Sequence, residues 1–301
     1  MRHVVPQRAL TGLRQLVGAR LVAEPERVQL ERIEPVSKPG YEPADMLITV
    51  KTYPAPSARH VETVCVAGVR LDRGEPEWVR LYPIAFRKLG EPEQFKKFQM
   101  VKADLRARGT TDSRPESHSP DLDSLMLGEV INTKRNWERR RELLGPLLGQ
   151  TSTCELIRLN KAGTMADAIP SLGLIKPDVL DVIVKPGKPW TGKQLAKVKL
   201  SAEPDLFNTP LTELQPMAYQ VMYRYRCESG GCPGHLQSVL DWELGVAGWR
   251  WPRIYGPETA NKILEKWEEM TAADKDTYFF VGNQHQYRQA FSVLGVRWPK
   301  R

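Results

Sequence analysis

The sequence has little cysteine and no long uncharged apolar run. Its 301 residues include only 4 cysteines, which is too few for a disulfide framework in a chain of this length, and it has no secretory hydrophobic segment. We therefore expect reduced thiols and a cytoplasmic location. Charged residues interrupt every apolar run before it reaches the roughly 18 residues of a membrane span, so we expect no insertion into a membrane.

The short motifs of several large enzyme classes are also missing. The sequence has no P-loop, no GxGxxG, no HExxH and no GxSxG. The sequence therefore lacks the familiar signatures of nucleotide hydrolases, dinucleotide-binding enzymes, zinc proteases and serine hydrolases. The sequence alone therefore leaves open whether the protein is an enzyme.

The composition that remains is that of a folded, basic protein. Hydrophobic residues make up 41% of the chain, which contains 8 Trp, 9 Tyr and 7 Phe, so a real core is expected. There are 44 Lys and Arg against 36 Asp and Glu, giving a formal net charge of +8. A positive excess of this kind favours a polyanionic partner.

Changes in composition divide the chain into four parts. Residues 1–45 are poor in apolar residues and predict a flexible arm or an upstream extension. Residues 46–120 contain short β-branched runs separated by turn residues, which predict a small β-rich domain, either barrel-like or an antiparallel sheet. Residues 121–150 predict a basic helical connector, with a helix from Leu125 to Leu148. Residues 151–301 predict an α+β domain, so the fold class of the whole chain is α+β.

Within the last part, the pattern of apolar residues assigns most elements. Strict alternation over Ala218–Cys227 predicts a half-buried strand, and the segment after His235 predicts a helix through Leu244. A second helix is expected over Pro257–Met270. Further strands are expected in the segments CELIRL, DVLDVIVK, TYFFVGN and AFSVLGVRWP.

Two cysteines and a histidine lie close together at the end of the alternating strand. Cys227, Cys232 and His235 surround a turn that contains three glycines, a strand–turn–helix arrangement that resembles a zinc knuckle. A closed zinc site needs a fourth ligand, for which Cys154 is the first choice and His285 the second. The alternative is that these residues occupy a polar turn and bind no metal.

Basic residues mixed with aromatic residues form a second pattern. Cations neutralise phosphates, and flat rings stack on unpaired bases, so this mixture favours contact with nucleic acid. The alternative is a set of solvated helix faces anchored by their aromatic residues. The predicted contact residues are Arg80, Arg87, Lys96, Lys97, Lys134, Arg135, Trp137, Arg139, Arg140 and Arg141.

Three acidic residues near the cysteine motif raise the question of a nuclease. Asp241, Glu243 and Asp276 are the candidates, because nucleases gather carboxylates around Mg²⁺. On a helix, however, Asp241 and Glu243 point about 200° apart, and the spacing matches no nuclease motif. Exposed surface acids are the better interpretation of this pattern.

Several segments together resemble a family of uncharacterised bacterial and archaeal proteins. They are KTYP at residues 51–54, WVRLYP at 78–83, RPES at 114–117, the segment from Cys227 through DWE at 241–243, and FFVGN at 279–283. The resemblance implies that the folded part starts near Met46. It implies no established activity.

These patterns together predict a nucleic-acid-binding protein with structural zinc, of the kind that serves genome maintenance or defence against mobile elements. Two alternatives belong to other classes. One is a metal-dependent nuclease that uses the acids named above. The other is a zinc-stabilised module that binds another protein.

Overall fold

The computed structural model describes residues 37–57, 61–202, 212–228 and 230–301. Most of the predicted arm, residues 1–36, lies outside the described residues. No helix within the described ranges is long and apolar enough to cross a membrane.

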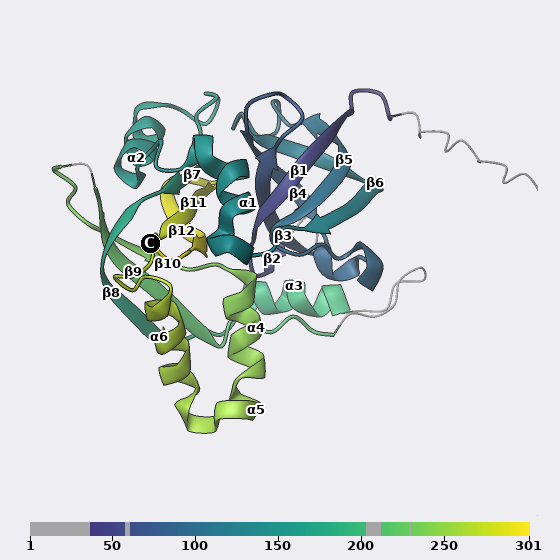
Figure 1. Ribbon diagram of the computed structural model, residues 1–301. Helices are drawn as coiled ribbons and strands as arrows, with labels where there is room; N and C mark the ends of the chain where they lie inside the picture. The colour runs from purple at the N-terminus through teal and green to yellow at the C-terminus, as the bar shows by residue number, and fades with distance from the viewer. Residues whose placement is uncertain (1–36, 58–60, 203–211, 229) are drawn as a thin grey trace, which may run out of the picture. The chain divides into compact units, whose positions relative to one another are not determined.

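Five strands close into a barrel in the N-terminal part (Figure 1). They are β1 (Glu42–Lys51), β3 (Val61–Arg70), β4 (Glu77–Ile84), β5 (Gln99–Ala107) and β6 (Ser117–Val130). Strand β1 pairs with both β3 and β5, and a bulge between Ile48 and Val50 lets it bend between them. Strands β4 and β6 run parallel, whereas every other pair in the barrel is antiparallel. This order, with a single parallel pair, is that of an OB-fold barrel.

Short elements decorate the barrel. Strand β2 (Ala55–Ser57) pairs with β3 outside the closed ring, and the 3₁₀ turns η1 (Phe86–Lys88) and η2 (Glu91–Glu93) connect β4 to β5. The strands point alternate side chains inward, as in β5, where Val101, Ala103 and Leu105 are buried. This alternation fills the barrel with apolar side chains.

Two three-stranded sheets form the C-terminal part. One has the order β8 (Pro177–Pro186), β9 (Tyr219–Cys227), β10 (His235–Ser238), and the other β7 (Leu172–Ile175), β11 (Tyr278–Gln284), β12 (Tyr287–Arg297). A parallel bridge between Val239 and Val293 connects the two sheets. The helical elements are α1 (Lys134–Leu144), η3 (Gly145–Leu147), α2 (Thr153–Ala162), α3 (Gly192–Ala202), α4 (Trp242–Arg250), α5 (Pro252–Tyr255), η4 (Gly256–Glu258) and α6 (Thr259–Glu269).

A shared apolar core joins the barrel to the C-terminal sheets. Leu47 and Val69 of the barrel belong to the same buried cluster as Leu174, Phe280 and Leu294 of β7, β11 and β12. Burying a side chain of this size stabilises the fold by roughly 1.5–3 kcal/mol. The outer face of the barrel is therefore held firmly against the sheet that carries FFVGN.

The predicted α+β class is confirmed, including the barrel. The strands predicted for residues 46–84, 178–185, 218–227 and 277–299 are present, as is the helix predicted within 257–270. The described structure extends the barrel beyond the expected range, because β1 begins at Glu42 and β6 continues to Val130. The division into four domains stays a prediction.

Three predicted elements are wrong. The first part of the helix expected over 125–148 is strand, because Leu125 and Leu127 pack on the barrel core. The segment CELIRL is helix α2 rather than a strand, and Ser152 caps its first turn by accepting a hydrogen bond from the amide of Glu155. The segment after His235 is strand β10, paired with β9, and the helix begins only after Asp241.

Candidate functional site

Four ligand-type side chains converge at one end of strand β9. The Sγ atoms of Cys154, Cys227 and Cys232 and a ring nitrogen of His235 all lie within 4.8 Å of one another. His235 Nε2 lies 3.3 Å from the sulfurs of Cys154 and Cys232 and 3.4 Å from that of Cys227. This cluster could hold a metal ion, and the predicted convergence of these four residues is seen in the structure.

Local structure explains the convergence. Cys154 lies in the first turn of α2, while Cys227 ends β9 and His235 begins β10. Gly231 and Gly234 take φ values of 83° and 92°, which glycine adopts without steric cost, so the turn between the strands can fold back tightly. Because β10 replaces the expected helix, the motif is a strand–turn–strand hairpin.

The donor atoms suit a tetrahedral metal. Bonds of about 2.3 Å to sulfur and about 2.0 Å to nitrogen place tetrahedral ligand atoms about 3.5–3.8 Å apart, close to the separations in the cluster. Burial lowers the pKa of His235, which keeps the imidazole neutral and able to donate a lone pair. Burial and the neighbouring thiols raise the pKa of the Cys154 thiol to about 12, whereas a bound cation favours the thiolate.

A cavity of about 650 Å³ lies between the barrel and the C-terminal sheets. Its barrel side is formed by Cys65 of β3, by Arg80 and Tyr82 of β4, and by two segments, one within residues 52–56 that includes the start of β2 and one within the loop 108–114 after β5. Its opposite side is formed by residues near β8, β9, β10 and the β11–β12 turn. Both parts of the chain therefore contribute walls to the same cavity.

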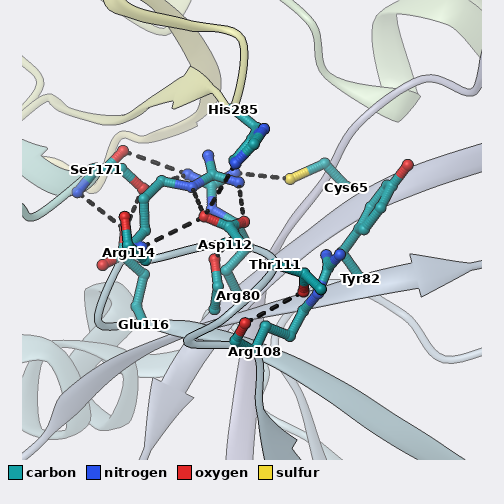
Figure 2. Close-up of polar contacts among 12 residues, drawn as sticks. Cys65, Arg80, Tyr82, Arg108, Thr111, Asp112, Arg114, Glu116, Ser171 and His285 are labelled. Carbon is teal, nitrogen blue, oxygen red and sulfur yellow. Dashed lines mark hydrogen bonds and ion pairs between the residues drawn. The ribbon is translucent and has the colours of Figure 1, made fainter. Parts of the chain in front are cut away.

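A network of buried charges lies at one side of the cavity (Figure 2). Arg114 donates to both oxygens of Asp112, at 2.9 and 2.6 Å, and to Asn283 at 3.2 Å. Burial opposes ionisation of Asp112, but the hydrogen bonds from Arg114 and Ser117 outweigh it and hold the pKa of Asp112 well below its ordinary value. Asp112 therefore holds the guanidinium of Arg114 in place at the cavity wall.

Arg80 is buried beside this network and has no carboxylate partner among the described residues. It is 3% exposed, and its Nη atoms donate to Cys65 Sγ at 2.9 Å and to Ser171 Oγ at 3.0 Å. Its Nε has no hydrogen-bond partner in the part of the chain that the structure describes. Space for the guanidinium depends on Gly282, because a Cβ there would lie 3.1 Å from Arg80 Nη2.

Arg108 and His285 line the same cavity. The guanidinium of Arg108 lies 4.9 Å from the centre of the Tyr82 ring, a cation–π contact. Burial lowers the pKa of His285, and Arg114, Arg288 and Arg108 lower it further, although Asp112 opposes them. His285, the second choice for a metal ligand, thus lies at the cavity and outside the cysteine cluster.

The predicted nucleic-acid contacts have varied surroundings. Lys96, Lys134, Arg135, Arg139 and Arg141 are exposed, and Arg80 lines the cavity. Arg87 donates to the carbonyl of Thr212.

Three of these predicted contacts pack against the protein itself. Arg140 is buried, with its guanidinium 3.7 Å from the centre of the Phe98 ring, and Trp137 packs against Phe98 and Trp298. Lys97 pairs with Asp241 at 2.7 Å. The basic runs therefore contain structural as well as exposed cations.

The three candidate acids are neutralised by cations. Asp241 is buried, contrary to the expected surface position, and caps α4 while it shares Lys97 with Glu243. Asp276 pairs with Lys176 and Arg297. Within the described ranges, the cysteine–histidine cluster is the one group of three or more ligand-type side chains close enough to share a metal. The acids do not form the converging site that a nuclease requires.

Sequence reasoning missed most of the cavity. Arg114, Asp112 and Cys65 were not predicted as site residues, and His285 was considered only as a metal ligand, although a signal was present. Segments that carry the family resemblance all contribute residues to the cavity wall. These residues are Thr52–Pro54 of KTYP, Arg80 and Tyr82 of WVRLYP, Arg114 of RPES, and Gly282 and Asn283 of FFVGN. The segments that carry the family resemblance thus meet in space around it.

Comparison with known proteins gives family matches and distant structural likenesses. Residues 149–301 match the domain of unknown function DUF8757, and residues 42–146 match the domain of unknown function DUF8758. No curated protein matches the chain. A solved structure titled "Structure of murine DNA binding protein bound with ds DNA" aligns at a TM-score of 0.29 and 7% identity, covering 86% of this chain and 96% of that chain. A TM-score this low does not establish a common fold.

Proposed function

The chain belongs to the DUF8757 family, and we propose that it binds single-stranded nucleic acid in the basic cavity between its barrel and its C-terminal sheets. One observation carries the proposal. The cavity wall combines cations, namely Arg80, Arg108 and Arg114, with aromatic rings, namely Tyr82 and Trp190. Cations neutralise phosphates and rings stack on unpaired bases, so this combination suits a strand whose bases are not paired.

The position of the cavity on the barrel supports the same function. OB-fold barrels bind oligonucleotides or oligosaccharides on the face of their second and third strands and on two adjoining loops. The equivalents here are β3, β4 and the segments 52–57 and 108–116, which include many residues that line the cavity. This support is an analogy at the level of the fold, and the charge of the cavity wall favours the nucleic acid over a neutral sugar.

Fluorescence anisotropy with short labelled single strands of DNA and RNA tests the proposal, with duplex DNA as the comparison. We expect single strands to bind more tightly than duplex. Arg108→Gln should weaken binding to every sequence and reduce the slope of log K against log salt by about 0.7, the value for one single-strand phosphate contact. Lys134→Gln is the matched control, because Lys134 is exposed and does not line the cavity. No binding by the wild type, or equal effects of both variants, would refute the proposal.

We further propose that the cysteine–histidine cluster holds one structural zinc ion. Three thiolates and one imidazole complete a four-coordinate site and leave no open position for water, which is typical of structural zinc. Such an ion would tie α2 to the β9–β10 hairpin. Thiolate ligation of this kind suits the reducing environment of the cytoplasm, where we place the protein.

A further inference from the structure

We infer that the cavity receives a single unstacked nucleotide unit, whose phosphate is bound at Arg80. The inference rests on the proposed function and specifies which part of a nucleic acid enters the site. It also applies to a free nucleotide, because the chemistry recognised is the same. Charge, hydrogen bonding and cavity size each support it.

The buried charges around the cavity do not balance. Three buried guanidinium groups, those of Arg80, Arg114 and Arg288, face two buried carboxylates, those of Asp112 and Glu116. Asp112 binds Arg114 directly and lies 4.0 Å from Arg288. Among the described residues, one positive charge is therefore left without a buried counter-charge, and an unpaired buried charge is costly. An anion in the cavity would offset that cost.

Hydrogen bonding and position together identify Arg80 as the group that lacks the anion. Arg80 and Arg288 both have an Nε without a hydrogen-bond partner among the described residues, but Arg80 lines the cavity, whereas Arg288 is not among the lining residues and lies 4.0 Å from Asp112. The nearest acid in its hydrogen-bond network, Glu116, reaches the amide and the hydroxyl of Ser171 rather than the guanidinium. In the described part of the chain, the guanidinium of Arg80 donates only to the sulfur of Cys65 and to oxygens of Ser171, and its Nε has no acceptor. A phosphate offers several acceptor oxygens to a guanidinium, which binds such groups in a fork geometry.

The size of the cavity limits what else can enter. A volume of about 650 Å³ falls within the range of sites for single small ligands, roughly 300–1,000 Å³. A base within a duplex must leave the stack to occupy such a site. Tyr82, Trp190 and Tyr219 line the cavity and offer ring faces to an unstacked base.

Isothermal titration calorimetry tests the inference directly, with a nucleoside 5′-monophosphate, the matching nucleoside and inorganic phosphate as probes. We expect the monophosphate to bind more tightly than either part alone. Arg80→Met should weaken monophosphate binding at least about tenfold, because it removes the charge-assisted hydrogen bonds to the phosphate. Arg139→Gln is the control, because Arg139 is exposed and pairs with Glu129 away from the cavity.

A second variant guards against misfolding of Arg80→Met. Ser238→Trp fills the cavity from β10 without removing a charge, and it should abolish monophosphate binding while the thermal unfolding transition is kept. If the wild type and the correctly folded variants bind the monophosphate equally, the inference is wrong.

Competition separates the inference from the proposed function. We expect the monophosphate to displace a labelled single strand, and strands with and without a terminal phosphate distinguish an end from an extruded internal nucleotide. If the strand binds but Arg80→Met leaves its affinity unchanged and the monophosphate does not compete, the inference fails and the proposed function stands. If no strand binds while the monophosphate binds through Arg80, the proposed function fails and the cavity is a site for a free nucleotide.

Discussion

Lys51 should make the stability of the protein depend on pH in an unusual direction. Lys51 is only 8% exposed, and its Nζ lies 4.0 Å from the centre of the Phe86 ring and 4.7 Å from the centre of the Trp242 ring. Burial lowers the pKa of Lys51 from 10.5 to about 8, and nearby Lys97 adds to this, although Glu243 and Asp241 oppose it. Its buried ammonium therefore costs stability at neutral pH.

The sign and the size follow from the two pKa values. Above about pH 8 the folded state loses the proton of Lys51, whereas the unfolded state keeps it up to about pH 10.5, so the unfolded state binds more protons in between. Stability from this group therefore rises with pH. From about pH 7 to about pH 9.5, the gain is about 2 kcal/mol.

Urea unfolding across this pH range measures the effect in the wild type and in Lys51→Met. The difference in unfolding free energy, wild type minus variant, should rise by about 2 kcal/mol from about pH 7 to about pH 9.5. Lys102→Met is the control, because the side chain of Lys102 is 66% exposed, and its difference should stay constant. Parallel pH curves for the wild type and Lys51→Met would refute the reasoning.

Three further predictions concern the metal, the start of the folded part and the loss of stability in acid. Cys232→Ser should lose the bound metal in elemental analysis and melt at lower temperature, whereas Cys65→Ser, outside the cluster, should keep the metal. A chain that starts at Ser37 should have the same melting temperature in calorimetry as the full chain. A chain that starts at Met46 should melt several degrees lower, because it loses part of β1 and Glu42, which pairs with buried Arg70. Because the pKa of Asp112 is depressed, its contribution is present above its ordinary pKa and falls as acid is added, so the stability advantage of the wild type over Asp112→Asn should shrink below about pH 4.

The sequence predicts elements well where periodicity is strict and poorly where apolar runs are short. Alternation along β9 identified the strand, and Val221, Tyr223 and Tyr225 are buried on one face as expected. The four-residue strand β10 is too short to show a period, so the following helical pattern was extended over it. Helix α2 was predicted as a strand, because the short apolar run CELIRL within it fits a strand as well as a helix.

The metal cluster could be predicted because three of its members are close in sequence. The cavity could not be predicted in the same way, because Cys65, Arg80, Asp112 and His285 come from separate segments and meet only through the packing of the barrel on the C-terminal sheets. Nor does a basic run reveal which cation is buried. Arg140 lies between exposed Arg139 and Arg141, and its guanidinium is buried because it stacks on Phe98 and Trp137 and donates to the carbonyl of Ile131.

The shared cavity has a consequence for how the protein could be divided. The segments that match the two family models meet at residues 147–148, yet each segment supplies only one wall of the site. Two fragments separated at this junction would each carry part of the cavity lining, Arg80 on one and His285 on the other. Neither fragment alone would form the complete cavity. Binding of a ligand in the cavity would therefore require both fragments, and it could be used to detect their reassembly.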